Sequence, residues 1–151
     1  MMMHDIMRGE FYCFCSIIRI AEMRNVRGAA EKTKGVILLV EDDAQHAKLL
    51  VQAIAQRRPY RVFHASDGPT TLKFTEYFRP NLFILDYRLP AMNGIELYER
   101  LRLRRDLQHI PVLMISAALP SKEIRERGIV GLRKPFNLQD LFRKIDSLLS
   151  E

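Results

Sequence analysis

Short, fully apolar runs alternate along the chain with longer segments in which apolar residues recur every three or four positions. The first run, residues 36–40, is Val-Ile-Leu-Leu-Val, which is typical of a strand buried on both faces of a sheet. Residues 44–56 then place Ala47, Leu50 and Ile54 on one helical face. This pair recurs four times: strands are predicted at residues 60–65, 82–85, 112–115 and 129–132, and helices at residues 70–78, 95–103, 121–127 and 138–149.

Strands that alternate with helices in this way predict an α/β fold, in which a parallel sheet is covered by helices on both faces. Because crossovers between parallel strands are right-handed, few topologies remain. Ligands of such sheets bind beyond the carboxyl ends of the strands, where the strand order reverses. The residues directly after each apolar run are therefore the candidates for function. One of them has a local role instead: Asp43 directly precedes the first predicted helix and is expected to cap it.

Residues 1–35 lack this periodicity, and we expect them to be an N-terminal appendage to a domain at residues 36–150. The appendage is interpreted either as a disordered segment or as the result of a start assigned too far upstream, with Met23 as the alternative start. Both interpretations make it dispensable for folding, because few buried contacts would be lost. A third interpretation is that residues 11–20 form a short helix that binds a partner or a second copy.

Composition limits the chain to one globular domain of ordinary make-up. Its 151 residues are 48% hydrophobic and 28% charged. Its apolar runs are far shorter than the ~20 residues that a membrane helix needs. Asp5 and Glu10 stand where a secretory signal is basic or apolar, and Cys13 and Cys15 are too few for a disulfide framework. We therefore expect a cytoplasmic protein without membrane contact.

The net charge of +6 raises the question of nucleic-acid binding. The densest basic run, residues 100–105, comes at the end of a predicted helix, where basic side chains complement the negative end of the helix dipole. No recognition motif accompanies the charge. We expect no nucleic-acid partner.

Charged and hydroxyl side chains follow the predicted strands. Glu41 and Asp42 come after the first strand and Asp86 after the third, while Ser116 and Lys134 follow the last two. Carboxylates that are brought together repel one another, so their ionised forms need a cation. Mg²⁺ suits them, because it takes oxygen ligands from carboxylates, phosphates and water. Such a crevice indicates phosphoryl chemistry in which a carboxylate can be the nucleophile.

Four segments, in order, resemble the signature of response-regulator receiver domains. They are residues 37–43 (ILLVEDD), 85–94 (LDYRLPAMNG), 115–117 (ISA) and 134–136 (KPF). The spacing also agrees with the family, since Asp42 precedes Asp86 by 44 residues and Asp86 precedes Ser116 by 30. The resemblance covers residues 35–150. It implies a flavodoxin-like, doubly wound (βα)5 fold with a five-stranded parallel sheet in the order 2-1-3-4-5.

The resemblance also assigns roles to the residues at the strand ends. Asp86 would accept a phosphoryl group and would share a Mg²⁺ ion with two further carboxylates. Asp42 would bind that ion directly and Glu41 through water, and the backbone carbonyl of Arg88 would complete the ligands from the protein. Lys134 would pair with the phosphoryl oxygens.

The resemblance implies roles for three more residues near this site. Ser116 would be the hydroxyl that turns inward to bond a phosphoryl oxygen. Pro135 would follow a cis peptide bond, and Gly94 would permit backbone geometry that other residues resist. The implied phosphodonor is a histidine kinase or a histidine phosphotransfer protein, and the downstream target is an unidentified protein. Such a chain catalyses only its own phosphorylation and dephosphorylation and is not an enzyme in the usual sense.

Two features depart from the family pattern. Ser116 and Lys134 are 18 residues apart, about one helical turn (~3.6 residues) less than is usual, which predicts a shortened fourth helix. Gly131 stands three residues before the lysine, where an aromatic switch residue is usual. Because glycine has no side chain to swing, phosphorylation would be reported by the backbone of residues 116–120 or by relay of the phosphoryl group.

Other classes of protein fit the sequence less well. A pseudo-receiver, an interaction module that is not phosphorylated, would lack Asp86, Asp42 or Lys134, and none of them is missing. A DNA-binding regulator would need a helix-turn-helix region, and a metabolic enzyme a glycine-rich nucleotide loop. Because the last predicted helix reaches residue 149, we expect a stand-alone receiver. The histidines show no pairing at helical or strand spacing and receive no role: they are His4, His46, His64 and His109.

Overall fold

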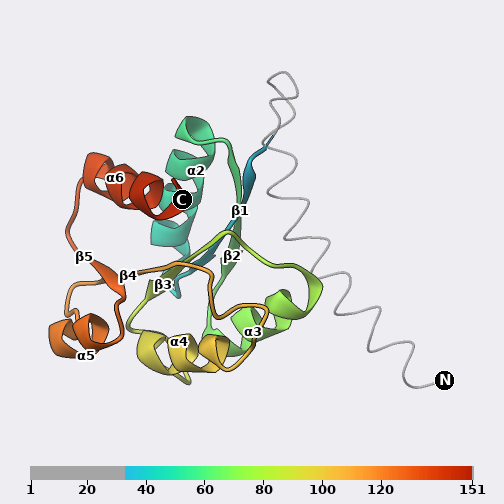
Figure 1. Cartoon of the computed structure of the whole chain (residues 1–151). Helices are drawn as coiled ribbons and strands as arrows, with labels where there is room; N and C mark the ends of the chain where they lie inside the picture. The colour runs from blue at the N-terminus through green and yellow to red at the C-terminus, as the bar shows by residue number, and fades with distance from the viewer. Residues whose placement is uncertain (1–32, 151) are drawn as a thin grey trace.

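The computed structural model describes residues 33–150, in which strands and helices alternate as the sequence predicts. With the labels of Figure 1, the strands are β1 (Gly35–Val40), β2 (Tyr60–Ala65), β3 (Leu82–Asp86), β4 (Val112–Ser116) and β5 (Val130–Arg133). The helices are α2 (Ala44–Arg57), α3 (Gly68–Tyr77), α4 (Gly94–Arg102), α5 (Ser121–Glu126) and α6 (Leu138–Leu149). Observed ends coincide with the predicted ones or differ from them by at most two residues. The interpretations of residues 1–32 lie outside the described residues, and the domain boundary stays a prediction.

The strands form one parallel sheet in the order β2-β1-β3-β4-β5, which confirms the predicted fold class. The chain leaves β1 toward β2 and then crosses to β3 on the other side of β1. The order of the strands therefore reverses between β1 and β3, whose carboxyl ends lie side by side because Val40 pairs with Leu85. Ligands of such sheets bind at this position.

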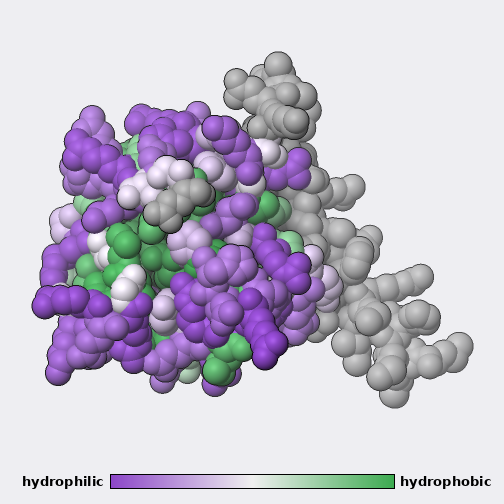
Figure 2. Space-filling view, in the orientation of Figure 1, coloured by the Kyte–Doolittle hydropathy of each residue, from purple (hydrophilic) through white to green (hydrophobic). Residues whose placement is uncertain are grey.

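Both faces of the sheet are covered, which explains why β1 has no polar position. Leu38 and Val40 face the layer made by α3, α4 and α5, whereas Ile37 and Leu39 face α2 and α6, and all four are fully buried (Figure 1). The outer surfaces of the helices are mostly hydrophilic, and apolar side chains gather between α6 and the α4–α5 layer (Figure 2). Among residues 33–150, no helix has the length and apolar composition needed to cross a bilayer.

Side-chain caps fix where α2, α3, α4 and α6 begin, whereas α5 has none. The Asp43 side chain accepts hydrogen bonds from the backbone N–H groups of Gln45 and His46, at 3.0 and 3.1 Å, so its predicted capping role is confirmed. Asn93 and Glu96 form a reciprocal capping box at the start of α4. Helix α2 therefore begins immediately after the acidic run that follows β1.

The fourth helix of the repeat, α5, has six residues, as the short interval before Lys134 predicts. Beneath it, a Cβ atom on Gly131 would come within 2.7 Å of Ile124 Cδ1 and 3.2 Å of Leu119 Cδ1. Side chains of α5 and of the loop before it thus occupy the space beside residue 131. The absence of a side chain on β5 at this position allows that packing.

Helix α5 is also fastened to α4. The Arg127 guanidinium donates to Glu99 Oε1 from Nη2 at 2.6 Å and from Nε at 3.1 Å. The Tyr98 hydroxyl donates to the Arg127 carbonyl at 3.3 Å. These bonds connect the end of α5 to the middle of the longer helix.

Candidate functional site

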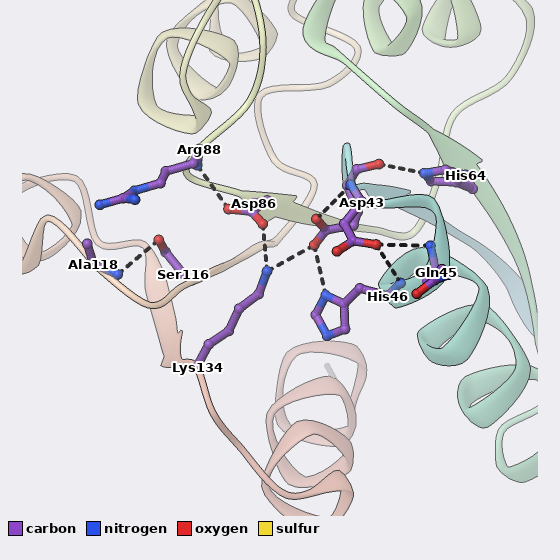
Figure 3. A network of polar contacts seen from close by, with 10 residues as sticks. Asp43, Gln45, His46, His64, Asp86, Arg88, Ser116, Ala118 and Lys134 are labelled. Carbon is purple, nitrogen blue, oxygen red and sulfur yellow. Dashed lines mark hydrogen bonds and ion pairs between the residues drawn. The ribbon is translucent and has the colours of Figure 1, made fainter.

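Two carboxylates from the strand ends converge on Lys134, as Figure 3 shows. Asp86 ends β3 and is 5% exposed, and Glu41 follows β1 and is 1% exposed. The Nζ atom of Lys134, which follows β5, lies 2.7 Å from Asp86 Oδ2 and 3.1 Å from Glu41 Oε2. The peptide bond between Lys134 and Pro135 is cis, as the resemblance implies. The Lys134 ammonium group therefore pairs with both buried carboxylates.

A third carboxylate completes the cluster. Oxygen atoms of Glu41, Asp42 and Asp86 lie within 4.8 Å of one another, and Asp42 is exposed. The predicted carboxylates are therefore brought together at the switch point of the sheet. The cluster has three carboxylates and one lysine, which leaves an excess of negative charge among oxygen donors. This donor set fits a hard divalent cation and is typical of the magnesium site of receiver domains.

The crowding changes the acid–base properties of the buried groups. The pKa of Glu41 is raised, first because burial disfavours its charged form and then because of the hydrogen bond and the charge of Asp86; Lys134 opposes this rise. Burial lowers the pKa of Lys134, but its hydrogen bonds with the two carboxylates outweigh burial and leave that pKa raised. The lysine is therefore held in its charged form beside Asp86.

The loop after β3 orients Asp86. Its Oδ1 atom accepts a hydrogen bond from the Arg88 backbone N–H at 2.9 Å, and the Arg88 side chain points away from it (Figure 3). A Cβ atom on Gly94 would lie 2.7 Å from the carbonyl oxygen of Asp86 and 3.0 Å from Tyr87 Cα. Gly94 therefore permits a backbone arrangement that any side chain would resist, as expected, and lets α4 start against the backbone of Asp86. The positive φ of this loop falls on Ala91, at 70°.

Ser116 ends β4 and is buried. Its Oγ atom accepts a hydrogen bond from the Ala118 backbone N–H at 3.1 Å, while its carbonyl accepts one from the Lys134 N–H at 3.0 Å. The hydroxyl therefore lies on the same edge of the sheet as Asp86 and is engaged by the loop that leads to α5 (Figure 3).

Sequence reasoning missed two histidines at the site. His46 Nδ1 lies 3.1 Å from Glu41 Oε2, and His64 Nε2 lies 2.6 Å from the Glu41 carbonyl oxygen. The pairing of β1 with β2 places His64 opposite Leu39, two residues before Glu41, so knowledge of the register could have suggested the second contact. The first contact depends on the angle at which α2 leaves the sheet, for which the sequence has no signal.

The fold and the acidic pocket define a doubly wound α/β protein with a polar site at its switch point. The family model of the response regulator receiver domain matches residues 37–146. Because this match covers well over half of the chain, the chain belongs to the response regulator receiver family. Its relatives include chemotaxis proteins of the CheY type, so it is a receiver domain of two-component signalling and not a conventional enzyme.

Individual relatives agree with this assignment. The chain is 28% identical to the chemotaxis protein CheY-3 of Vibrio cholerae over 120 residues, which are 76% of this chain and 92% of that protein. It is 32% identical over 120 residues to the transcriptional regulatory protein PhoP of Bacillus subtilis, covering 74% of this chain but only 48% of PhoP. The crystallised chemotaxis protein CheY4 of Vibrio cholerae superposes with a TM-score of 0.69 at 27% identity, covering 76% of this chain and 98% of that structure.

Proposed function

We propose that the chain is a response regulator that accepts a phosphoryl group on Asp86. The observation that supports this most is the placement of the Asp86 carboxylate: it is almost fully buried at the switch point, with one oxygen 2.7 Å from Lys134 and the other held by the Arg88 N–H. This arrangement fixes the carboxylate and sets a permanent positive charge beside it. Residues 36–150 would be the unit that carries the function.

The chemistry is an exchange of one bond to phosphorus for another. A carboxylate oxygen of Asp86 attacks the phosphorus of a phosphohistidine or a small acyl phosphate, and the donor leaves with the electrons of its own bond to phosphorus. Negative charge on the phosphoryl oxygens is offset by Lys134 and by a hydrogen bond from Ser116. Water later attacks the acyl phosphate and returns the free carboxylate together with phosphate.

The carboxylate cluster would hold Mg²⁺ through Glu41, Asp42 and Asp86, with the Arg88 carbonyl as a further ligand. The fit follows from the donors themselves, which are all oxygens and carry more negative charge than Lys134 neutralises. A bound Mg²⁺ would supply positive charge close to the phosphoryl oxygens. Lys134 and the Arg88 backbone N–H hold the Asp86 carboxylate in place.

The phosphodonor would be a histidine kinase or a histidine phosphotransfer protein, as membership of the receiver family supports. The signal would then leave through contact with a protein target or through relay of the phosphoryl group. A second candidate function is that of a pseudo-receiver, which binds a partner without being phosphorylated. The complete set of Asp86, Asp42 and Lys134 favours the first function.

Intact-mass spectrometry after incubation with acetyl phosphate and Mg²⁺ tests the proposal. We expect the wild type to gain one phosphoryl group, and Asp86→Asn to gain none. Asp140→Asn, in a first-turn residue of α6 whose side chain pairs with Arg143, is the matched control and should behave like the wild type. Labelling of Asp86→Asn would show that the acceptor is another residue. A wild type that neither gains mass nor binds beryllofluoride would support the pseudo-receiver instead.

A further inference from the structure

The Glu41 carboxylate is held at both of its oxygens. Oε1 accepts from the Asp43 backbone N–H at 3.2 Å, and Oε2 contacts both Lys134 Nζ and His46 Nδ1, each at 3.1 Å. Because a carboxylate oxygen only accepts hydrogen bonds, the Nδ1 atom of His46 carries the proton of its contact. Glu41 Oε2 therefore has two donors from different parts of the chain, α2 and the loop after β5.

The second donor matters because Lys134 is shared. Its ammonium contacts both Asp86 and Glu41, and in the function proposed above it must turn toward a phosphoryl group on Asp86. A buried carboxylate oxygen that loses its only partner is strongly destabilised. With His46 in place, Glu41 Oε2 keeps a donor when the lysine moves away.

The imidazole of His46 is itself held in place. Its backbone N–H donates to the cap residue Asp43, so the residue sits in the first turn of α2. Its ring faces that of Phe136 at a centroid distance of 6.3 Å with the planes tilted by 50°, and its side chain is 31% exposed. The ring thus lies between Glu41 and the segment that carries Lys134, while the metal-ligating set of carboxylates does not include it.

We propose that His46 is a positioning residue of the magnesium site, which donates to Glu41 and so orients that carboxylate for the cation and frees Lys134 to serve Asp86. The inference rests on the phosphoacceptor function proposed above and concerns a residue that only acts through Glu41. Residues that hydrogen-bond to metal ligands in this way commonly contribute tenfold or more to metal affinity.

The test is isothermal titration calorimetry of the full chain with Mg²⁺ at one fixed pH. Thermal unfolding of each variant is recorded in parallel. His46→Leu removes the donor at similar volume, and His46→Asn keeps it, because the amide nitrogen of asparagine takes the position of Nδ1. We expect His46→Leu to weaken Mg²⁺ binding about tenfold and His46→Asn to recover most of that loss. His109→Leu, at an exposed position before β4, is the control and should bind like the wild type. If His46→Leu does not fold, His46→Ala gives the same comparison.

Equal Mg²⁺ affinity in His46→Leu and the wild type would overturn the inference. An equal loss in His46→Leu and His46→Asn would also overturn it, because packing against Phe136 would then explain the effect. These outcomes are distinct from a failure of the proposed function, in which the wild type itself would show neither Mg²⁺ binding nor labelling of Asp86. A wild type that is labelled, beside an unaffected His46→Leu, would refute only the role of His46.

Discussion

Lys134 Nζ lies 2.7 Å from Asp86 Oδ2, although the two residues are 48 positions apart in the sequence and follow different strands. The lysine side chain is 23% exposed, whereas the carboxylate is almost fully buried. The pair therefore places a partly exposed positive charge over a buried negative charge. Lys134 is the natural residue with which to test the electrostatics of the acidic pocket.

Replacing Lys134 by Met should destabilise the metal-free protein by about 3 kcal/mol, because two buried carboxylates then lose their common cation. Addition of Mg²⁺ should recover more of the free energy of unfolding in this variant than in the wild type, since a cation that binds only the folded state stabilises it. Urea unfolding with and without Mg²⁺ measures both quantities. Lys48→Met, at an exposed position on α2, is the control. Unchanged stability of Lys134→Met in chelator would contradict this account of the pocket.

The sequence predicts the main features of this pocket for a physical reason. A strand such as β1, apolar at every position from Val36 to Val40, must be buried on both faces, and that requires a parallel sheet covered by helices. Parallel strands then bring their carboxyl ends to one edge. The residues that follow the strands, such as Glu41 and Asp86, are consequently close in space however far apart they are in sequence.

Other features could not be predicted, because they depend on distances that the pattern does not contain. The contact of His46 with Glu41 requires a particular angle between α2 and β1. The reason that residue 94 must be a glycine follows only from the structure, in which the start of α4 lies against the Asp86 carbonyl. The positive φ of Ala91 is likewise invisible in the sequence, since alanine is a poor residue for that conformation.

Ala91→Gly should stabilise the protein by about 1 kcal/mol, because at a φ of 70° glycine avoids the clash of Cβ with its own backbone. Chemical denaturation monitored by circular dichroism measures the change. The matched control is Ala55→Gly at an exposed position on α2, where the same substitution should cost about 1 kcal/mol. Destabilisation by both substitutions would show that the loop after β3 does not hold Ala91 in the left-handed conformation.

An ion-pair network away from the pocket should make the free energy of unfolding depend on pH. Asp106 accepts hydrogen bonds from Arg104 at 2.7 and 3.2 Å and from Arg79 at 3.1 Å, and Arg104 also donates to Thr75 at the end of α3. The Arg104 hydrogen bond is the largest cause of the lowered pKa of Asp106. The unfolded chain therefore binds the proton more readily than the folded protein, so the stabilisation is present above 3.8 and is lost as the pH falls below that value.

Asp106→Asn should accordingly be less stable than the wild type near neutral pH, and the difference should shrink as the pH falls below 3.8. Urea unfolding of the two proteins over a series of pH values gives the difference directly. Asp67→Asn, which keeps an amide oxygen as an acceptor for the Thr70 N–H at the start of α3, is a suitable comparison. A difference in the free energy of unfolding that is constant over the whole pH range would mean that the charge of Asp106 does not contribute to stability.

The response to phosphorylation should be concentrated near the pocket. Ser116 is engaged by the Ala118 N–H, so a turn of its hydroxyl toward Asp86 changes the loop at residues 116–120. Helix α5 beyond this loop is fastened to α4 by Arg127, and Gly131 has no side chain that could carry the change into β5. We therefore expect the change to stop at the start of α5 and the output to rely on the loop, on α2 or on relay of the phosphoryl group.

Amide chemical shifts with and without beryllofluoride and Mg²⁺ test this expectation residue by residue. Shifts should be large beside Asp86 and in residues 116–118, and small in α5 and β5. Glu99→Gln, which removes the charge that fastens Arg127, should let the shifts spread into α5 while leaving those beside Asp86 unchanged, because Glu99 is on the outer side of α4 and is 54% exposed. Shifts over the whole of residues 119–131 of the wild type that equal those beside Asp86 would contradict the argument, since the fastened helix would then be moving as part of the switch.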